Sequence, residues 1–228
     1  SGSMFPEQLQ KIVKGKLDAG IAFDGDADRL VMVDELGAVL DGDKLIGIAA
    51  IHAKDNNQLN KDTVVVTHYA NSGLDSSLKE HNIKVVRVKI GDRYVTKELF
   101  KNNLSIGGEN SGHIIFSEFS KTADAVLASV QILKAMKEQN KKLSELAAAV
   151  KKNPQVLVNV MVREKKNLED MPTVTQKITE AKSKLEDGRV FVRYSGTESL
   201  LRILVEGKDN IQQIANDIAN AVKVEIGK

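Results

Sequence analysis

Three aspartates at alternate positions, Asp24, Asp26 and Asp28, lie between two short apolar runs at 20–23 and 30–33. Carboxylates crowded this closely raise one another's pKa, because each negative charge opposes ionisation of the next. A divalent cation would neutralise them, and a site with oxygen ligands alone suits Mg²⁺ or Ca²⁺. The flanking runs are rich in Ile, Val and Phe, as is typical of buried strands. The sequence therefore predicts a strand, an acidic metal-binding loop and a returning strand.

The same residues allow two other interpretations. The spacing, with Glu35 at the twelfth position, superficially fits a calcium-binding EF-hand loop. That loop requires Gly at its sixth position, where this chain has Arg29, and it requires a helix on each side. Both failures argue against an EF-hand. An acidic surface turn without metal remains an alternative, because Asp and Gly are ordinary turn residues.

The composition excludes several classes of protein. The 228 residues are 42% hydrophobic and 28% charged, as in ordinary globular proteins. A net charge of +2 gives no electrostatic case for nucleic acid or an anionic membrane as a partner. No apolar run is long enough to span a membrane. The chain contains no cysteine, which excludes disulfides and fits a cytoplasmic location.

Strands and helices alternate along the chain, which predicts a mostly parallel α/β layer structure. Ser1-Gly2-Ser3 before Met4 resembles the remnant of an expression tag, and a helix over 5–16 leads into the first strand, so we expect the chain to begin inside a domain. Breaks at the Asn-rich segment 55–61 and at Asn153-Pro154 suggest domain boundaries. The expected fold is a partial α/β domain over 5–55, a complete α/β domain over 56–152 and a small α+β domain over 153–228.

The middle domain carries a Gly-rich loop with Glu109, Ser111 and His113 at alternate positions. On an extended segment, alternate side chains point to one side. A carboxylate, a hydroxyl and an imidazole side by side suit the hydroxyl groups of a sugar. The alternative is a polar turn in which His113 finds a local partner.

The last domain carries a loop that suits a phosphate dianion. Arg193 supplies a guanidinium, Ser195 and Thr197 supply hydroxyls, and a turn at Gly196 frees backbone amides. Arg202 could add a second guanidinium, although by alternation it could face either side of its strand. Taken alone, a Ser-Gly-Thr segment of this kind is more often only a hairpin turn.

A metal loop, a sugar loop and a phosphate loop, one in each expected domain, describe a site for a phosphorylated sugar. The three motifs D-G-D-x-D-R at 24–29, G-E-x-S-G-H at 108–113 and R-x-S-G-T-E at 193–198 occur in this order. From about Phe5 to its C-terminus, the chain resembles the α-D-phosphohexomutases. These are four-domain enzymes that move phosphate between C1 and C6 of a hexose.

The resemblance implies a role for each loop. Mg²⁺ would be held by the three aspartates of the acidic loop, Asp24, Asp26 and Asp28, with Arg29 as a catalytic residue near the transferring phosphoryl group. The sugar would be bound by Glu109, Ser111 and His113. The other phosphate would be anchored by Arg193, Ser195, Gly196, Thr197 and Arg202.

Segments 90–95 and 154–160 are similar to the subgroup that interconverts glucosamine 6-phosphate and glucosamine 1-phosphate on the route to cell-wall precursors. The chain departs from the family pattern at Ala27, where Gly is more usual, and at Ser199, where Pro is usual. The family's nucleophile is a phosphoserine in a Thr-Ala-Ser-His-Asn-Pro-like loop of the first domain, and no such segment occurs here.

The missing nucleophile defines what the chain is expected to do. We expect the C-terminal portion of a phosphohexomutase, inactive without the missing N-terminal domains. Two alternatives stay open. One is a fragment of a glucose- or mannose-phosphate mutase, and the other is a non-catalytic module that binds phosphosugar or metal.

Overall fold

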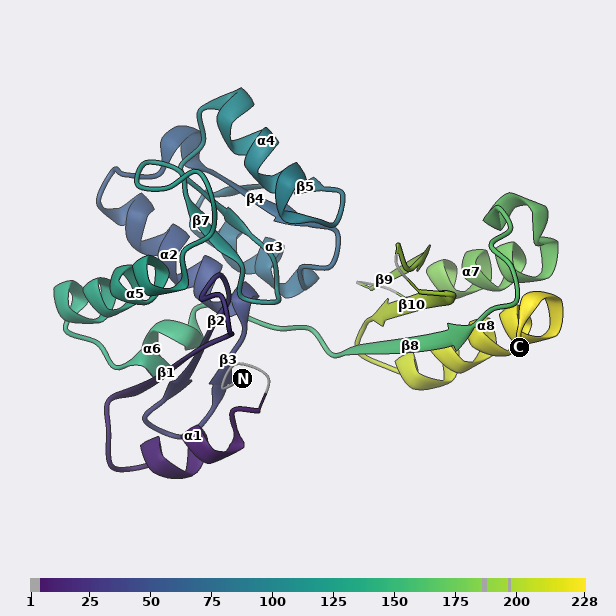
Figure 1. Cartoon of the computed structure of the whole chain (residues 1–228), viewed down its shortest axis with the longest axis horizontal. Helices are drawn as coiled ribbons and strands as arrows, with labels where there is room; N and C mark the ends of the chain where they lie inside the picture. The colour runs from purple at the N-terminus through teal and green to yellow at the C-terminus, as the bar shows by residue number, and fades with distance from the viewer. Residues whose placement is uncertain (1–4, 186–187, 197) are drawn as a thin grey trace. The chain divides into compact units, whose positions relative to one another are not determined.

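The computed structural model describes residues 5–185, 188–196 and 198–228. The chain divides into two compact units between Lys152 and Asn153 (Figure 1). Each unit is described by itself. Within the described residues, no helix is long and apolar enough to cross a bilayer.

The first unit begins with a small antiparallel sheet. Strand β1 (Ala19–Phe23) pairs with β2 (Leu30–Asp34), and β2 pairs with β3 (Val39–Leu40). Phe23 and Leu30 are the last partners in the β1–β2 ladder, so the acidic loop is the hairpin connection between these strands. Helix α1 (Glu7–Val13) contacts β1 and β2. Strands on both sides of the loop confirm the predicted strand–loop–strand arrangement and rule out the EF-hand geometry.

A four-stranded sheet with helices on both faces forms the rest of this unit. Its order is β5-β4-β6-β7, in which β5, β4 and β6 run parallel and β7 is antiparallel to β6. The strands are β4 (Thr63–Thr67), β5 (Lys84–Val88), β6 (Ile106–Gly108) and β7 (Ile114–Phe116). The helices are α2 (Gly42–Asp55), α3 (Ser72–Glu80), α4 (Asp92–Asn102), α5 (Ala125–Gln139) and α6 (Leu143–Ala148), and a short 3₁₀ turn covers Asn60–Asp62.

Successive side chains of β4 point to opposite faces of the sheet, and each face is covered by a layer of helices. Val65 packs with Val95 and Leu99 of α4 on one face of the sheet. Val64 and Val66 belong to a larger core on the other face, together with buried residues of α2, α3, α5 and α6. Because both faces are covered, the strand is apolar throughout its middle, as expected for a buried parallel sheet.

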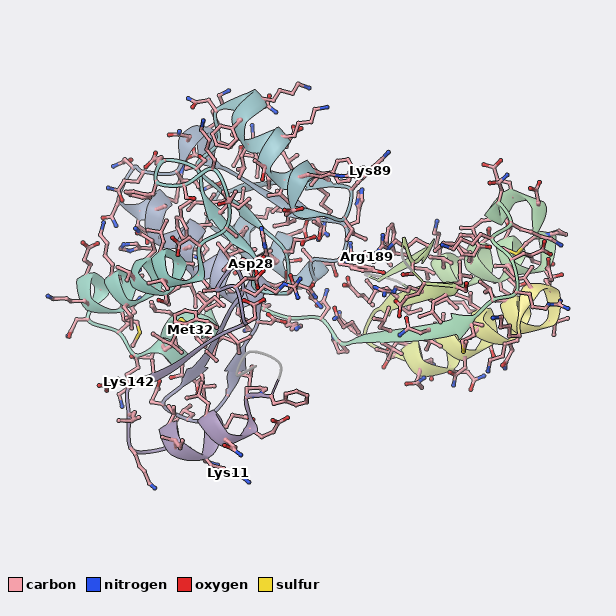
Figure 2. All side chains as sticks on the ribbon, in the orientation of Figure 1. Lys11, Asp28, Met32, Lys89, Lys142 and Arg189 are labelled. Carbon is pink, nitrogen blue, oxygen red and sulfur yellow. The ribbon has the colours of Figure 1, made fainter. Side chains whose placement is uncertain are left out.

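The small antiparallel sheet shares that larger core. Leu30, Met32 and Leu40 are fully or almost fully buried in the same cluster as Leu45 and Val66. Figure 2 labels Met32 on β2. The helix α2 therefore packs against both sheets. The division of this unit at residue 55, expected from the sequence, stays a prediction.

The second unit is a two-layer α+β arrangement. Its antiparallel sheet has the order β8-β10-β9, with β8 (Gln155–Met161), β9 (Arg189–Tyr194) and β10 (Leu200–Glu206). Helices α7 (Pro172–Lys184) and α8 (Ile211–Ile226) cover one face, and a 3₁₀ turn covers Leu168–Asp170. Leu201, Ile203 and Val205 of β10 point into this core. The alternate residues, including Arg202, lie on the other face of the sheet.

The strands and helices alternate along the first unit, as expected from the sequence. Helix α5 begins at Ala125, because the Asp124 side chain accepts a hydrogen bond from the Leu127 N–H and caps the helix there. Strand β6 pairs with β4 along its length.

Candidate functional site

The acidic loop gathers its three carboxylates. The Ala27 N–H donates to the Asp24 carbonyl at 3.3 Å and closes a tight turn, with Ala27 at φ +56°. One carboxylate oxygen from each of Asp24, Asp26 and Asp28 lies within 4.8 Å of the other two. Neighbouring ligands of an octahedral Mg²⁺ lie about 3 Å apart and opposite ligands about 4 Å apart. The carboxylates would therefore draw closer to one another, by up to roughly 2 Å, to bind that ion together.

The two carboxylate oxygens of Asp28 differ in their hydrogen bonding. Its Oδ2 lies 3.1 Å from Nδ1 of His113. Its Oδ1 is buried and has no hydrogen-bond partner among the described residues. A buried carboxylate oxygen without a donor is costly, so this atom fits a metal ligand. Figure 2 labels Asp28.

The pKa values of Asp24 and Asp28 shift in opposite directions. Burial and the neighbouring Asp24 carboxylate raise the pKa of Asp28, although His113 opposes the rise. Burial also acts to raise the pKa of Asp24, but the Arg29 backbone N–H and guanidinium outweigh it, and that pKa is lowered. Ionisation of both Asp24 and Asp28 is opposed by the repulsion between their negative charges, and a bound cation would remove that repulsion.

Arg29 contacts the loop mainly through its backbone. Its N–H donates to Asp24 Oδ1 at 3.1 Å, and its Nε lies 3.7 Å from Asp24 Oδ2. The side chain is about half exposed, at 52%. An exposed ion pair of this length stabilises the fold little, so the guanidinium remains able to turn toward an anion.

The sugar loop lies directly against the acidic loop. The Leu30 N–H donates to the Gly112 carbonyl at 3.0 Å, and Arg29 and His113 form an antiparallel bridge. From the other side, the Gly42 N–H at the start of α2 donates to the Asn110 carbonyl at 3.0 Å. Asp28 and His113 are 85 positions apart in the chain. Backbone contacts therefore hold together two loops that are distant in sequence.

The sugar loop is a reverse turn and not an extended segment. The Gly112 N–H donates to the Glu109 carbonyl at 3.1 Å, and the Glu109 N–H donates to the His113 carbonyl at 2.9 Å. Gly112 has φ +94°, a conformation that favours glycine. The alternation argument for a common side therefore does not apply. His113 is buried against Asp28, whereas Ser111 is exposed.

Glu109 points to a segment that was not among the predicted site residues. Its Oε1 accepts a hydrogen bond of 3.0 Å from the Gly91 N–H. Gly91 is the N-cap of α4 and has φ +124°, which a residue with a Cβ rarely adopts. A lone Gly between an apolar strand and a helix was the available signal.

Helix α5 is a second neighbour that the sequence did not reveal. The Ala125 N–H in its first turn donates to the Ala27 carbonyl at 3.0 Å. The positive end of the helix dipole therefore lies beside the three carboxylates, where it favours negative charge. Only the Asp124 cap was visible in advance as a signal for the start of this helix.

The phosphate loop lies in the second unit. Arg193 of β9 and Arg202 of β10 are direct cross-strand partners, so both side chains start from the same face of the sheet. Asn159 of β8 pairs with Arg202 and extends the row. Like charges placed opposite each other destabilise a sheet unless an anion compensates them. The register thus decides the orientation of Arg202 that alternation alone left open.

A carboxylate takes part in this loop. Glu198 Oε2 accepts from Arg202 Nη2 at 2.8 Å and from Ser195 Oγ at 3.3 Å. The Ser195 N–H donates to the Leu200 carbonyl at 2.8 Å, and Lys165 Nζ donates to the Ser195 carbonyl at 2.7 Å. Gly196 is exposed, and Thr197 lies outside the described residues.

Two family descriptions match the chain. Residues 41–153 match "Phosphoglucomutase/phosphomannomutase, alpha/beta/alpha domain III", and residues 157–221 match "Phosphoglucomutase/phosphomannomutase, C-terminal domain". Among curated proteins, the chain is 45% identical over 230 residues to a phosphoglucosamine mutase of Shouchella clausii, covering 99% of this chain and 52% of that protein. It is 46% identical over 229 residues to that of Caldanaerobacter subterraneus subsp. tengcongensis, covering 97% and 51%.

Solved structures show the same fold. An N-acetylglucosamine-phosphate mutase in its product complex matches with a TM-score of 0.78 at 24% identity, covering 97% of this chain and 52% of that one. An N-acetylphosphoglucosamine mutase of Aspergillus fumigatus, in complex with GlcNAc-6P and magnesium, matches with a TM-score of 0.73 at 24% identity, covering 90% and 48%. The chain spans about half the length of the curated relatives it matches.

Proposed function

This chain belongs to the phosphoglucomutase/phosphomannomutase family of phosphohexomutases, and from that membership we propose that it forms the C-terminal half of a phosphoglucosamine mutase. The whole enzyme interconverts glucosamine 6-phosphate and glucosamine 1-phosphate, a cytoplasmic step toward cell-wall precursors. The proposal is carried by the curated relatives at 44–46% identity that are named for this activity. The gathered carboxylates of the acidic loop support it independently.

The acidic loop is the proposed Mg²⁺ site, with Asp24, Asp26 and Asp28 as ligands. When bound, the ion would neutralise charge on the transferring phosphoryl group, which is the main electrostatic demand of such reactions. Arg29 would add its guanidinium to the same group. The exposed position of that side chain leaves it free to do so.

The sugar loop is the proposed binding site for the hydroxyl groups of the hexosamine. Ser111 is exposed and can reach a ligand, and Glu109 is fixed by the Gly91 N–H. His113 is engaged through Nδ1, so its contact to a sugar would be made through Nε2. The backbone contacts to the acidic loop support a common site for metal and sugar.

The phosphate that is not transferred would be anchored by the loop of the second unit. Arg193 and Arg202 would supply the positive charge, Ser195 and Thr197 would supply hydroxyls, and Gly196 would leave backbone amides open to the anion. The cross-strand pairing of the two arginines supports this assignment, because an anion between them would remove their repulsion.

The chain contains no phosphoserine loop of the family type, so the proposed function needs the N-terminal domains as a partner. We expect no mutase turnover from the 228-residue chain in an assay coupled to glucosamine 1-phosphate formation, and turnover when the phosphoserine-bearing half is present. The full-length enzyme should prefer glucosamine 6-phosphate over glucose and mannose 6-phosphates. A preference for either neutral sugar would contradict the assignment, and turnover by the chain alone would contradict the need for the missing domains.

A further inference from the structure

We propose that His113 is a positioning residue for the metal site, which selects the oxygen of Asp28 that binds the ion. The inference rests on the proposed Mg²⁺ site and deepens it. His113 was expected to bind sugar, but its imidazole contacts a carboxylate of the acidic loop. Its role is to hold one oxygen of Asp28 and thereby direct the other to the metal.

The two oxygens of Asp28 have different surroundings. Oδ2 lies 3.1 Å from His113 Nδ1, within hydrogen-bond distance. Oδ1 is buried and receives no hydrogen bond from the part of the chain that the structure describes. A free carboxylate can bind a metal through either oxygen. Because His113 occupies Oδ2 of Asp28, only Oδ1 is left for the ion.

The direction of this hydrogen bond follows from the chemistry of the partners. An ionised carboxylate accepts hydrogen bonds and has none to donate. His113 must therefore carry its proton on Nδ1. A histidine that orients a ligating carboxylate belongs to the shell of contacts that hold metal ligands in place, and loss of such a contact typically weakens metal binding 10–100-fold.

The fold gives His113 little freedom to adopt another position. The residue is only 9% exposed, and its backbone bridges Arg29, the last residue before β2. The preceding Gly112 lies so close to Leu30 that a Cβ there would be 2.1 Å from the Leu30 carbonyl oxygen. Backbone contacts thus hold the imidazole against the segment that carries the Asp28 carboxylate, as expected of a preorganised site.

Substitutions of His113 can distinguish a role of its Nδ1 hydrogen bond from a role of its side-chain volume. Asparagine places an amide nitrogen near the position of Nδ1, whereas glutamine places it near that of Nε2, and leucine supplies no donor. We expect His113→Asn to keep metal affinity within a few-fold of the wild type. His113→Leu and His113→Gln should lose 10–100-fold.

A second buried histidine provides a matched control. His52 is 6% exposed, and its Nε2 lies 3.0 Å from Glu138 Oε2, in the same unit but on α2. His52→Leu removes an equally buried imidazole next to a carboxylate without touching the acidic loop. It should leave metal affinity unchanged, even if it lowers stability.

The experiment is Mn²⁺ binding to the 228-residue chain, measured by electron paramagnetic resonance and by calorimetry with Mg²⁺ in competition. Thermal unfolding without metal checks that each variant is folded. Equal affinity of His113→Leu and wild type, or failure of His113→Asn to bind better than His113→Gln, would overturn the inference. A wild type that binds no Mn²⁺ would overturn the metal site itself, and the role of His113 with it.

A spectroscopic measurement gives a readout other than affinity. Nitrogen–proton correlation NMR of the imidazole rings shows which nitrogen carries the proton. We expect the proton of neutral His113 on Nδ1. A proton found on Nε2 alone would exclude donation to Asp28 and would overturn the proposal even if metal binding were impaired.

Discussion

The backbone N–H of Leu30 donates to the carbonyl of Gly112 at 3.0 Å, and this contact joins the strand after the acidic loop to the turn of the sugar loop. A Cβ on Gly112 would lie 2.1 Å from the Leu30 carbonyl oxygen and 3.0 Å from its nitrogen. The close approach is possible only because residue 112 is glycine. It makes the acidic loop and the sugar loop one structural element.

Replacement of Gly112 by alanine should therefore disrupt the site. The new Cβ would clash with Leu30, and φ +94° is unfavourable for alanine, so we expect a loss of at least about 2 kcal/mol in the free energy of unfolding. Urea unfolding measures it. Gly25→Ala is the control, because a Cβ at Gly25 meets nothing within 4 Å and should cost less than ~0.5 kcal/mol. Equal stability of the two variants would contradict the close approach.

Mg²⁺ should stabilise the chain through the acidic loop. A ligand at a hundred times its dissociation constant adds about 2.7 kcal/mol to the stability of the state that binds it. For a protein of this size that corresponds to a rise of roughly 5–10 °C in the melting temperature. Asp28→Asn removes the carboxylate with the open buried oxygen and should abolish most of the rise. A full Mg²⁺ response in this variant would exclude Asp28 as a ligand.

Asp43 should make stability depend on pH. The side chain is 2% exposed at the start of α2, and its Oδ2 accepts from the Asn71 N–H at 2.9 Å. Within residues 5–185, 188–196 and 198–228, its Oδ1 has no hydrogen-bond partner. Burial, with a smaller contribution from Asp41, raises the pKa of Asp43 to about 7. Because the folded state holds this proton to higher pH than the unfolded state, stability falls as pH rises from about 4 to about 7.

The test is Asp43→Asn, which keeps an acceptor for the Asn71 N–H and cannot ionise. The variant should match the wild type at low pH and exceed it at pH 8 by on the order of 2–4 kcal/mol. Chemical unfolding at pH 4 and pH 8 gives the comparison. A difference between variant and wild type that does not change with pH would show that Asp43 ionises normally.

Ala27 should be a point of strain in the acidic loop. Its φ of +56° lies in the left-handed region, which costs an alanine roughly 1 kcal/mol. Glycine removes that cost but gains freedom in the unfolded chain, so Ala27→Gly should be neutral or stabilising by up to ~1 kcal/mol. Ala38→Gly, at a residue without positive φ, should instead destabilise by ~0.5 kcal/mol. Urea unfolding measures both variants. An equal decrease in the free energy of unfolding for Ala27→Gly and Ala38→Gly would argue against the strained conformation.

Arg193→Ala should weaken binding of glucosamine 6-phosphate. A charge-assisted contact to phosphate contributes about 1.5–3 kcal/mol, which corresponds to roughly 10–150-fold in affinity. Calorimetry or NMR titration of the chain measures the change. Arg163→Ala is the control in the same unit, because Arg163 is exposed and its side chain donates to the Glu225 carbonyl at 3.3 Å. Unchanged affinity in Arg193→Ala would count against the phosphate site.

The sequence alone determined the local parts of this protein. Short β-branched runs on either side of Asp24–Arg29 identified the hairpin, because a strand's pattern is set by immediate neighbours. The Asp41 cap and the apolar residues after it are local signals for α2, since a cap and a helical period depend only on neighbouring residues. The three ordered motifs pointed to the family, and the two family descriptions confirm it.

Only the tertiary structure decided how those parts meet. The contact between His113 and Asp28 joins residues 85 positions apart, and nothing near either residue in the chain specifies the other. The turn at Gly112 replaced the expected extended segment because packing against Leu30 requires it. Pairing with Arg193 fixed the face of Arg202 that alternation left undecided. Local propensity determines which elements form, whereas strand register and the close approach of backbones determine which side chains share a site.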